Sequence, residues 1–261
     1  MKMKSEKKAT NPFRYSLPTR LRERIVFKWL QRKRGQKILD LGCGTGYFAS
    51  KLAAEGPFVV GMDLDISSVK FAKKNGMGHF VVGSAERLPF KDNTFDALLS
   101  TEVLEHLPVE DQALREVTRV GSDGAQFVLT VPSLDGILSK SPYRRLGHNE
   151  EGTEYHYRDG YRMLDIKNML QVCGIQVVKA RYSTGLFAEV IIESIKLIYL
   201  KFNPSFTSQA DLTKSESSLL FSLNKYIVFP LVFGISLIEE MLLGKGIKGH
   251  NIALKGAIAK K

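Results

Sequence analysis

The sequence is poor in cysteine, in acidic residues relative to basic ones, and in long charge-free apolar runs. Only two of its 261 residues are cysteines, and one of them, Cys43, lies between glycines. A disulfide framework is therefore not expected, and a reducing, cytoplasmic environment suits the chain best. Residues 1–10 are rich in lysine, but no apolar stretch follows them, so a secretory signal is not expected either.

The shortage of acidic residues leaves a strongly basic balance. Lysine and arginine total 38 against 27 aspartates and glutamates, which gives a formal net charge of +11. Such a surplus favours anionic partners, either nucleic acid or acidic lipid head groups, and charge alone does not choose between them. A hydrophobic content of 44% and a charged fraction of 25% predict a folded chain, with one domain and an elaboration.

Short apolar runs alternate with helical patterns after Gly35. The apolar runs predict strands over residues 38–41, 58–62, 80–82, 95–100, 126–131 and 176–180, with a last strand over 252–258. The helical patterns cover residues 47–55, 67–75, 109–120 and 161–173. This alternation is typical of right-handed βαβ units, so we expect an α/β fold with a doubly wound, mostly parallel sheet covered on both faces. An amphipathic helix with a basic face precedes it, from Leu21 to near Gly35, and is expected to pack on the domain rather than bind lipid or RNA.

The domain organisation follows from two composition shifts. Residues 1–17 are expected to form a basic flexible tail, and residues 18–261 the folded domain. An apolar helical insertion over residues 186–245 interrupts that domain before its last strand. The longest charge-free run of this insertion lies between Lys225 and Glu239 and contains Pro230, whereas a spanning helix needs about twenty apolar residues. The insertion is therefore expected either to lie in the membrane interface or to form an apolar lid or dimer contact.

A glycine-rich loop, Asp-Leu-Gly-Cys-Gly-Thr-Gly over residues 40–46, stands where the first strand gives way to a helix. Open α/β sheets bind ligands at this place, and glycines let a ligand approach the backbone closely. The spacing is neither that of the dinucleotide fingerprint nor that of a P-loop. Asp63 ends the second strand about twenty residues further on, where a carboxylate reaches ribose hydroxyls and repels a 2′-phosphate. The loop therefore predicts a nucleoside ligand that lacks this phosphate.

Further motifs follow in order: Val-Gly-Met-Asp at 60–63, Ser-Ala-Glu-Arg-Leu-Pro-Phe at 84–90, Phe-Asp at 95–96 and Glu-Val-Leu-Glu-His at 102–106. Together with residues 38–46 they resemble the small-molecule, type 11-like branch of class I S-adenosylmethionine-dependent methyltransferases. The resemblance runs over most of the chain outside the insertion. It implies a Rossmann-like seven-stranded sheet whose seventh strand is antiparallel, and S-adenosyl-L-methionine as the methyl donor.

The resemblance also implies a set of donor-binding residues. It implies that the methionine part of the donor is bound by Asp40, Gly42, Cys43, Gly44 and Gly46. Asp63 is implied as the ribose partner and Ser84 with Ala85 as the adenine partners, while Glu86 and Thr101 complete the set. Ser84 stands where many relatives carry Asp, which weakens the expected contact with adenine.

Methyl transfer needs no nucleophile on the protein, but a base may have to remove a proton from the acceptor, and His is the usual candidate near neutral pH. His106 and His156 are the expected catalytic residues, with His148 as a further candidate. Glu102, Glu105 and His106 would share one face if their turn is helical. This pattern resembles a magnesium site in catechol-type and small-RNA methyltransferases, so Mg²⁺ is conceivable, but no metal site is expected.

The leading hypothesis is an enzyme that methylates a hydrophobic or lipid-like small molecule at the membrane surface, cytoplasmic or peripherally attached. A nucleic-acid or protein methyltransferase is the alternative that the charge permits. Against this alternative, the sequence lacks a base-methylation motif of the Asn-Pro-Pro-aromatic type, since Ser-Thr-Glu-Val stands at residues 100–103. A non-catalytic module that binds a nucleoside or docks on a membrane remains the third hypothesis.

Overall fold

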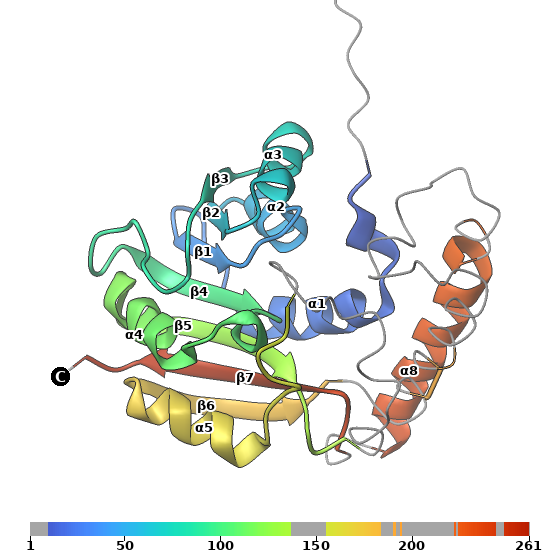
Figure 1. The fold of residues 1–261 in the computed structure, drawn as a ribbon. Coiled ribbons are helices and arrows are strands. Elements are labelled where there is room, and N and C mark those ends of the chain that lie inside the picture. The colour runs from blue at the N-terminus through green and yellow to red at the C-terminus, as the bar shows by residue number, and fades with distance from the viewer. Residues whose placement is uncertain are drawn as a thin grey trace, which may run out of the picture.

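The computed structural model describes residues 10–136, 155–183, 190–191, 194, 222, 224–243 and 248–260. Its centre is a seven-stranded sheet with the strand order β3-β2-β1-β4-β5-β7-β6 (Figure 1). The strands are β1 (Lys37–Leu41), β2 (Phe58–Asp63), β3 (His79–Val82), β4 (Phe95–Thr101), β5 (Gly121–Pro132), β6 (Ile175–Tyr182) and β7 (Asn251–Ile258). Only β7 is antiparallel to its neighbours among them, which confirms the predicted Rossmann-like sheet.

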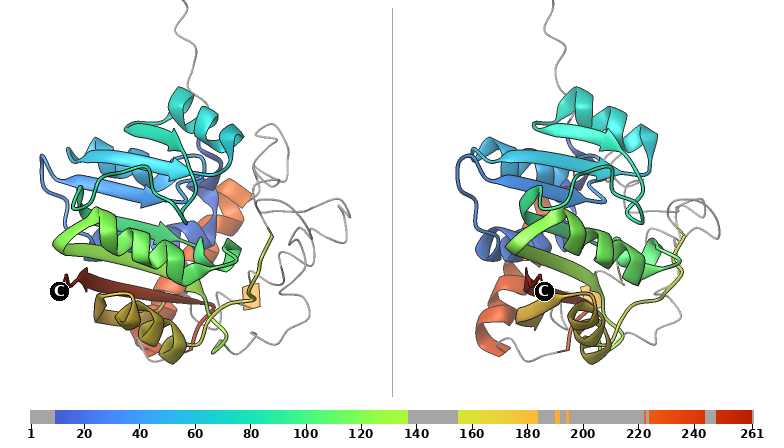
Figure 2. Two further views of the ribbon diagram at one scale, coloured as in Figure 1. Left: turned by 60° about the vertical axis from the view of Figure 1, so that its left-hand side comes forward. Right: turned by 90° about the vertical axis from the view of Figure 1, so that its left-hand side faces the viewer.

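Two layers of helices cover the sheet (Figure 2). Helices α1 (Leu17–Trp29), α2 (Tyr47–Ala54) and α3 (Ile66–Asn75) share a core with one face, to which Ile38 contributes. Helices α4 (Glu110–Val120) and α5 (Met163–Val172) share a second core with the other face, to which Leu39 contributes. Successive side chains of a strand point to opposite faces, so a strand buried on both sides reads as a continuous apolar run.

The folded part of the chain begins earlier than the sequence predicts. A 3₁₀ helix, η1 (Pro12–Tyr15), precedes α1, and the side chain of Asn11 accepts a hydrogen bond from its Phe13 amide. Helix α1 starts at Leu17 rather than Leu21 and ends at Trp29 rather than near Gly35. It ends there because Leu30 is extended and the guanidinium of Arg32 turns back to the carbonyls of Phe27 and Leu30.

The insertion leaves the sheet after β6 and returns at β7. Its first apolar stretch, 186–200, lies largely outside the described residues, as does the polar linker over 203–216. The second stretch forms a π-helical turn, η5 (Asn224–Val228), and α8 (Phe229–Leu243). Val232 of α8 packs against Leu17 and Leu21 of α1. In the described part of the chain, no helix combines the length and the apolar character that crossing a membrane requires.

Candidate functional site

The glycine-rich loop is held against β2 by its backbone. The amides of Gly42 and Cys43 both donate to the carbonyl of Met62, at 2.8 and 3.0 Å. The loop then closes with a hydrogen bond of 2.8 Å from the Gly46 amide to the Cys43 carbonyl, directly before α2. This places the loop at the carboxyl edge of the sheet, where α/β folds bind ligands.

The three loop glycines all have positive φ, but their surroundings differ. A Cβ on Gly42 would stand 2.2 Å from Val103, and one on Gly46 would stand 2.7 Å from the ring of Phe80. These two glycines are required by packing. A Cβ on Gly44 would meet no described atom within 4 Å, so the backbone there faces open space that a ligand can occupy.

Asp40 lies beneath this loop and is 1% exposed. Its Oδ2 accepts a hydrogen bond of 2.9 Å from the Ala49 amide, and its Oδ1 has no partner among the described residues. Burial raises the pKa of Asp40 to about 7, the charge of Asp63 adds to the rise, and the hydrogen bond from Ala49 opposes it. A buried carboxyl with one unsatisfied oxygen suits a cationic ligand group.

Asp63 fastens the loop from the end of β2. Its Oδ2 accepts from the Gly44 amide at 2.7 Å, and its Oδ1 accepts from the Asp65 amide at 2.9 Å. The carboxylate therefore holds two backbone turns, and it is only partly buried. The parallel register sets Asp63 beside Val82, the last residue of β3.

The other predicted donor residues lie at the same edge. Ser84 follows β3, and its Oγ accepts from the Glu86 amide at 3.2 Å, while Ala85 between them is buried. Thr101 ends β4. The edge thus gathers every predicted donor-binding residue, and their roles toward the donor stay predictions. Cys43 is buried, and burial raises the pKa of its thiol.

The turn after β4 does not form the helical arrangement that the sequence allowed. Only residues 104–106 are helical, as the 3₁₀ helix η2 (Leu104–His106), and Glu102 lies before it with a φ of 54°. Glu102 is fixed by residues far away in the sequence: Thr130 at 3.1 Å, Asn251 at 2.7 Å and Arg22 at 3.0 Å. It therefore faces α1 and β7 rather than sharing a helical face with Glu105 and His106.

Sequence reasoning missed these three partners of Glu102. Asn251 and Thr130 carry no local motif, and their meeting depends on the antiparallel return of β7. Arg22 is one of several cations on a basic helix face, and no motif distinguishes it from the others. The positive φ of a non-glycine residue at this edge marks a strained position, such as is often found at binding sites.

Glu105 is buried, and His106 and His156 lie together. Glu105 is 1% exposed, and neither of its carboxyl oxygens has a partner among the described residues. Burial, with the charge of Glu102 adding to it, raises the pKa of Glu105 well above its usual value. The rings of His106 and His156 are 4.3 Å apart, and Nδ1 of His106 lies 3.0 Å from the carbonyl of Tyr155.

The histidine pair therefore exists, and its role in catalysis stays a prediction. His148 lies outside the described residues. In the described ranges, no three His, Cys, Asp or Glu side chains are arranged to hold a metal ion.

Comparison with known proteins agrees with this geometry. A family model described as "Methyltransferase domain" matches residues 39–129. The chain is 37% identical to a demethylmenaquinone methyltransferase of Paenarthrobacter aurescens over 112 residues, which is 42% of this chain and 44% of that relative. It is 39% identical to an uncharacterized protein of Methanocaldococcus jannaschii over 195 residues, 67% of this chain and 74% of that one.

The fold has counterparts among solved structures. An S-adenosylmethionine-dependent methyltransferase of Mesorhizobium loti superposes with a TM-score of 0.56 at 14% identity. The superposition covers 93% of this chain and 100% of the other. The match to the Paenarthrobacter enzyme spans less than half of that enzyme's length. The family model, the sequence relatives and the shared fold together show that the chain belongs to the class I S-adenosylmethionine-dependent methyltransferases.

Proposed function

We propose that this protein transfers a methyl group from S-adenosylmethionine to a hydrophobic, lipid-like small molecule at a membrane surface. The observation that carries the acceptor class is the apolar insertion, whose helix α8 exposes large apolar residues and stands at the carboxyl edge of the sheet beside α1 (Figure 1). The donor loop lies at the same edge, so an acceptor held by the insertion is close to the donor.

The described residues suit the donor. The free Oδ1 of Asp40 would accept a hydrogen bond from the ammonium group of the methionine part. The open space at Gly44 would let the methionine part lie close to the loop backbone. The carboxylate of Asp63 would take the ribose hydroxyls, with Ser84 and Ala85 beside the adenine. Once bound, the donor would supply a methyl group on a sulfonium, and the acceptor would displace the neutral thioether S-adenosylhomocysteine without help from a protein nucleophile.

The protein's own contribution is to position the acceptor and to handle its proton. Holding acceptor and methyl group in line provides most of the acceleration in such displacements. His106, whose ring lies against that of His156, would receive the proton of an acceptor hydroxyl or amine. Glu102, held by Arg22 and Asn251, would anchor the backbone of the turn that carries His106.

A relative supports the acceptor class. One protein matched over residues of this domain is named for demethylmenaquinone, a hydrophobic substrate. The basic surplus of +11 and the apolar surface of α8 then have one explanation, because interfacial proteins combine cations with exposed apolar residues. Such a protein would be cytoplasmic and attached peripherally.

The test is transfer from an isotopically labelled donor. The full-length protein is incubated with lipid, quinone and RNA fractions, and the products are analysed by mass spectrometry. Label in a lipid or quinone fraction supports the proposal. Label only in RNA or protein would point to a macromolecular acceptor, and donor binding without transfer to any fraction would reject catalysis.

Donor binding should depend on pH through Asp40. The pKa of Asp40 is raised to about 7 in the free protein, and a cationic ligand favours the ionised form. Affinity should therefore rise from pH 5 to pH 7 and then level off, by at most about tenfold per pH unit. Calorimetry at several pH values measures this, and Asp40→Asn should remove the dependence. An equal pH dependence in the Asp40→Asn variant would contradict the assignment.

A further inference from the structure

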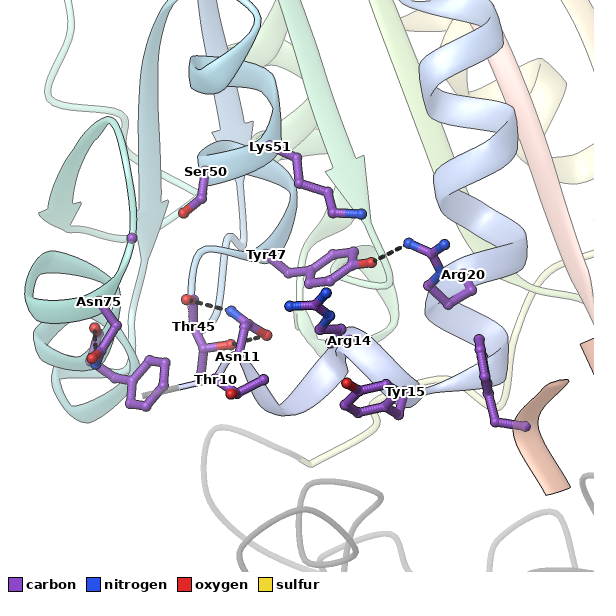
Figure 3. Close-up of a pocket in the computed structure, with 13 residues that line it drawn as sticks. Thr10, Asn11, Arg14, Tyr15, Arg20, Thr45, Tyr47, Ser50, Lys51 and Asn75 are labelled. Carbon is purple, nitrogen blue, oxygen red and sulfur yellow. Dashed lines mark hydrogen bonds between the residues drawn. The ribbon is translucent and has the colours of Figure 1, made fainter. Parts of the chain in front are cut away.

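A cavity lies on the outer side of α2, next to Thr45 of the glycine-rich loop (Figure 3). Its volume is about 700 Å³, and η1, α2, α3 and α8 contribute to its walls. Helix α2 turns Phe48 and Leu52 into the core, whereas Ser50 and Lys51 face this cavity. Tyr47 is buried with the core and also reaches the cavity wall. The cavity borders the donor loop through Thr45, but none of the side chains assigned above to the donor or to catalysis lines it.

The cavity is cationic. Arg14, Arg20 and Lys51 line it, and its described lining holds no carboxylate. Glu23, from α1 behind the lining, pairs with Arg20 at 2.5 Å and with Lys51 at 2.6 Å, and also accepts from Tyr47 at 2.6 Å. One carboxylate thus faces two cations. Within the described chain no carboxylate pairs with Arg14, so the cavity keeps a positive excess.

Polar and aromatic groups complete the lining. Thr10, Asn11, Thr45 and Ser50 bring hydroxyl and amide groups, which suit the oxygens of an anion. Asn11 ties the entrance to the donor loop, because its amide donates to the Thr45 carbonyl at 3.0 Å. Tyr15 and Phe229 form an apolar wall, with ring centroids 6.2 Å apart.

The wall at Tyr15 and Phe229 continues into an exposed apolar surface. Lys225 stands at this junction, its ammonium 5.2 Å from the ring of Tyr15 and 4.7 Å from that of Tyr226. Beyond it, large apolar residues of η5 and α8 are each more than half exposed: Tyr226, Ile227, Leu231, Ile238 and Met241. An anionic ligand in the cavity would therefore lie next to apolar side chains whose exposure to water is unfavourable.

We infer that this cavity binds the phosphate-bearing head group of an anionic phospholipid, while the exposed residues of η5 and α8 enter the acyl boundary. A nucleic acid would match the cations but leave the apolar surface unused. A free phosphate metabolite would also leave it unused. The inference deepens the membrane part of the proposed function and rests on it, naming the partner that brings this enzyme to its acceptor.

Vesicle partition of the full-length protein tests the inference. Sedimentation is measured with phosphatidylcholine vesicles, with and without phosphatidylglycerol, at low and high salt. The double variant Arg14→Gln with Lys225→Gln should lower partition onto the anionic vesicles about 25-fold, since each basic residue near such a surface contributes about fivefold. Neither cation pairs with a described carboxylate or contacts a residue assigned to the donor, so donor binding should stay unchanged. The thermal midpoint should fall only slightly, through the lost contacts with the ring of Tyr15.

The matched control removes the same charge from elsewhere on the protein. Lys37→Gln with Lys91→Gln changes two exposed cations outside this cavity, and it should lower partition by less than about fivefold. Equal losses of vesicle partition in the two double variants would show that overall charge alone causes the effect, and would overturn the proposed lipid site.

Two other ligands are tested in the same way. Binding of soluble glycerol 3-phosphate as tight as that of vesicles would also overturn the lipid site, in favour of a free metabolite. RNA binding that the double variant loses, with vesicle partition unchanged, would overturn it in favour of nucleic acid.

Failure of this site and failure of the proposed function give different results. Transfer to a lipid-like acceptor, with equal vesicle partition of the wild type and of Arg14→Gln with Lys225→Gln, rejects the lipid site alone. Loss of partition in that variant, with no acceptor methylated in any fraction, supports the lipid site and rejects the function.

Discussion

Replacing Gly46 by alanine should lower the free energy of unfolding by about 2–5 kcal/mol. The new Cβ would stand 2.7 Å from the Phe80 ring and 2.9 Å from the Cβ of Ala72, and φ is 77° at this position. Overpacking costs about 1–3 kcal/mol and a left-handed conformation about 1–2 kcal/mol in a residue with a Cβ. Urea unfolding followed by circular dichroism measures the loss.

Gly44→Ala is the matched control in the same loop. Its φ of 49° is also left-handed, but its Cβ would meet no described atom within 4 Å, so the loss should be no more than about 1–2 kcal/mol. Donor affinity should instead fall in this variant, because the methyl group occupies the space assigned to the donor. A Gly44→Ala protein that binds the donor normally would contradict that assignment. Similar stabilities of the two variants would show that the contacts around Gly46 relax freely.

Asp63→Ala should weaken donor binding by about 1–3 kcal/mol, or roughly 5- to 150-fold, the usual result of losing a charged hydrogen-bond partner. Two effects contribute, since Asp63 both holds the amides of Gly44 and Asp65 and would contact the ribose. Calorimetric titration with S-adenosylhomocysteine measures the total loss.

A double cycle separates the two effects. The 2′-deoxy analogue of S-adenosylhomocysteine should bind the wild type more weakly than the parent compound does. In Asp63→Ala the two compounds should bind almost equally, because the partner of the hydroxyl is gone. If the wild type and the variant discriminate equally, Asp63 acts only on the loop. Tighter binding of NAD than of the donor by the wild type would overturn the nucleoside assignment.

The central sheet was predictable from sequence because its strands are buried on both faces. Such strands, like residues 38–41 in β1, are short and almost wholly apolar, and glycine-rich turns mark their ends. The donor-binding edge was predictable for the same reason. The carboxyl ends of parallel strands lie at one edge of the sheet, so Asp40 at the end of β1 and Asp63 at the end of β2 were expected to lie near each other. Local pattern and tertiary structure agree at these positions.

The acceptor side was less predictable because long-range contacts determine it. The left-handed backbone of Glu102 depends on Thr130, Asn251 and Arg22, none of which lies within its own segment. Residues 10–17 read as part of a tail because their few apolar residues show no period. They are ordered by contacts elsewhere: Asn11 with Thr45, and Leu17 with Val232 of α8.

The pairing of β6 with β7 has a consequence for how the family can diversify. Tyr182, where the chain leaves the sheet, lies opposite Ile252, where it returns, and Ser183 donates to the carbonyl of Asn251 at 2.9 Å. Adjacent strands are about 4.8 Å apart, so the sheet itself fixes both ends of the intervening segment at neighbouring points. The entropic cost of closing a loop grows only slowly with its length, about 0.6 kcal/mol per doubling. Segments of very different size and composition can therefore be exchanged between these two anchor points while the donor loop keeps its geometry, which makes this junction a natural place for grafting new acceptor specificities.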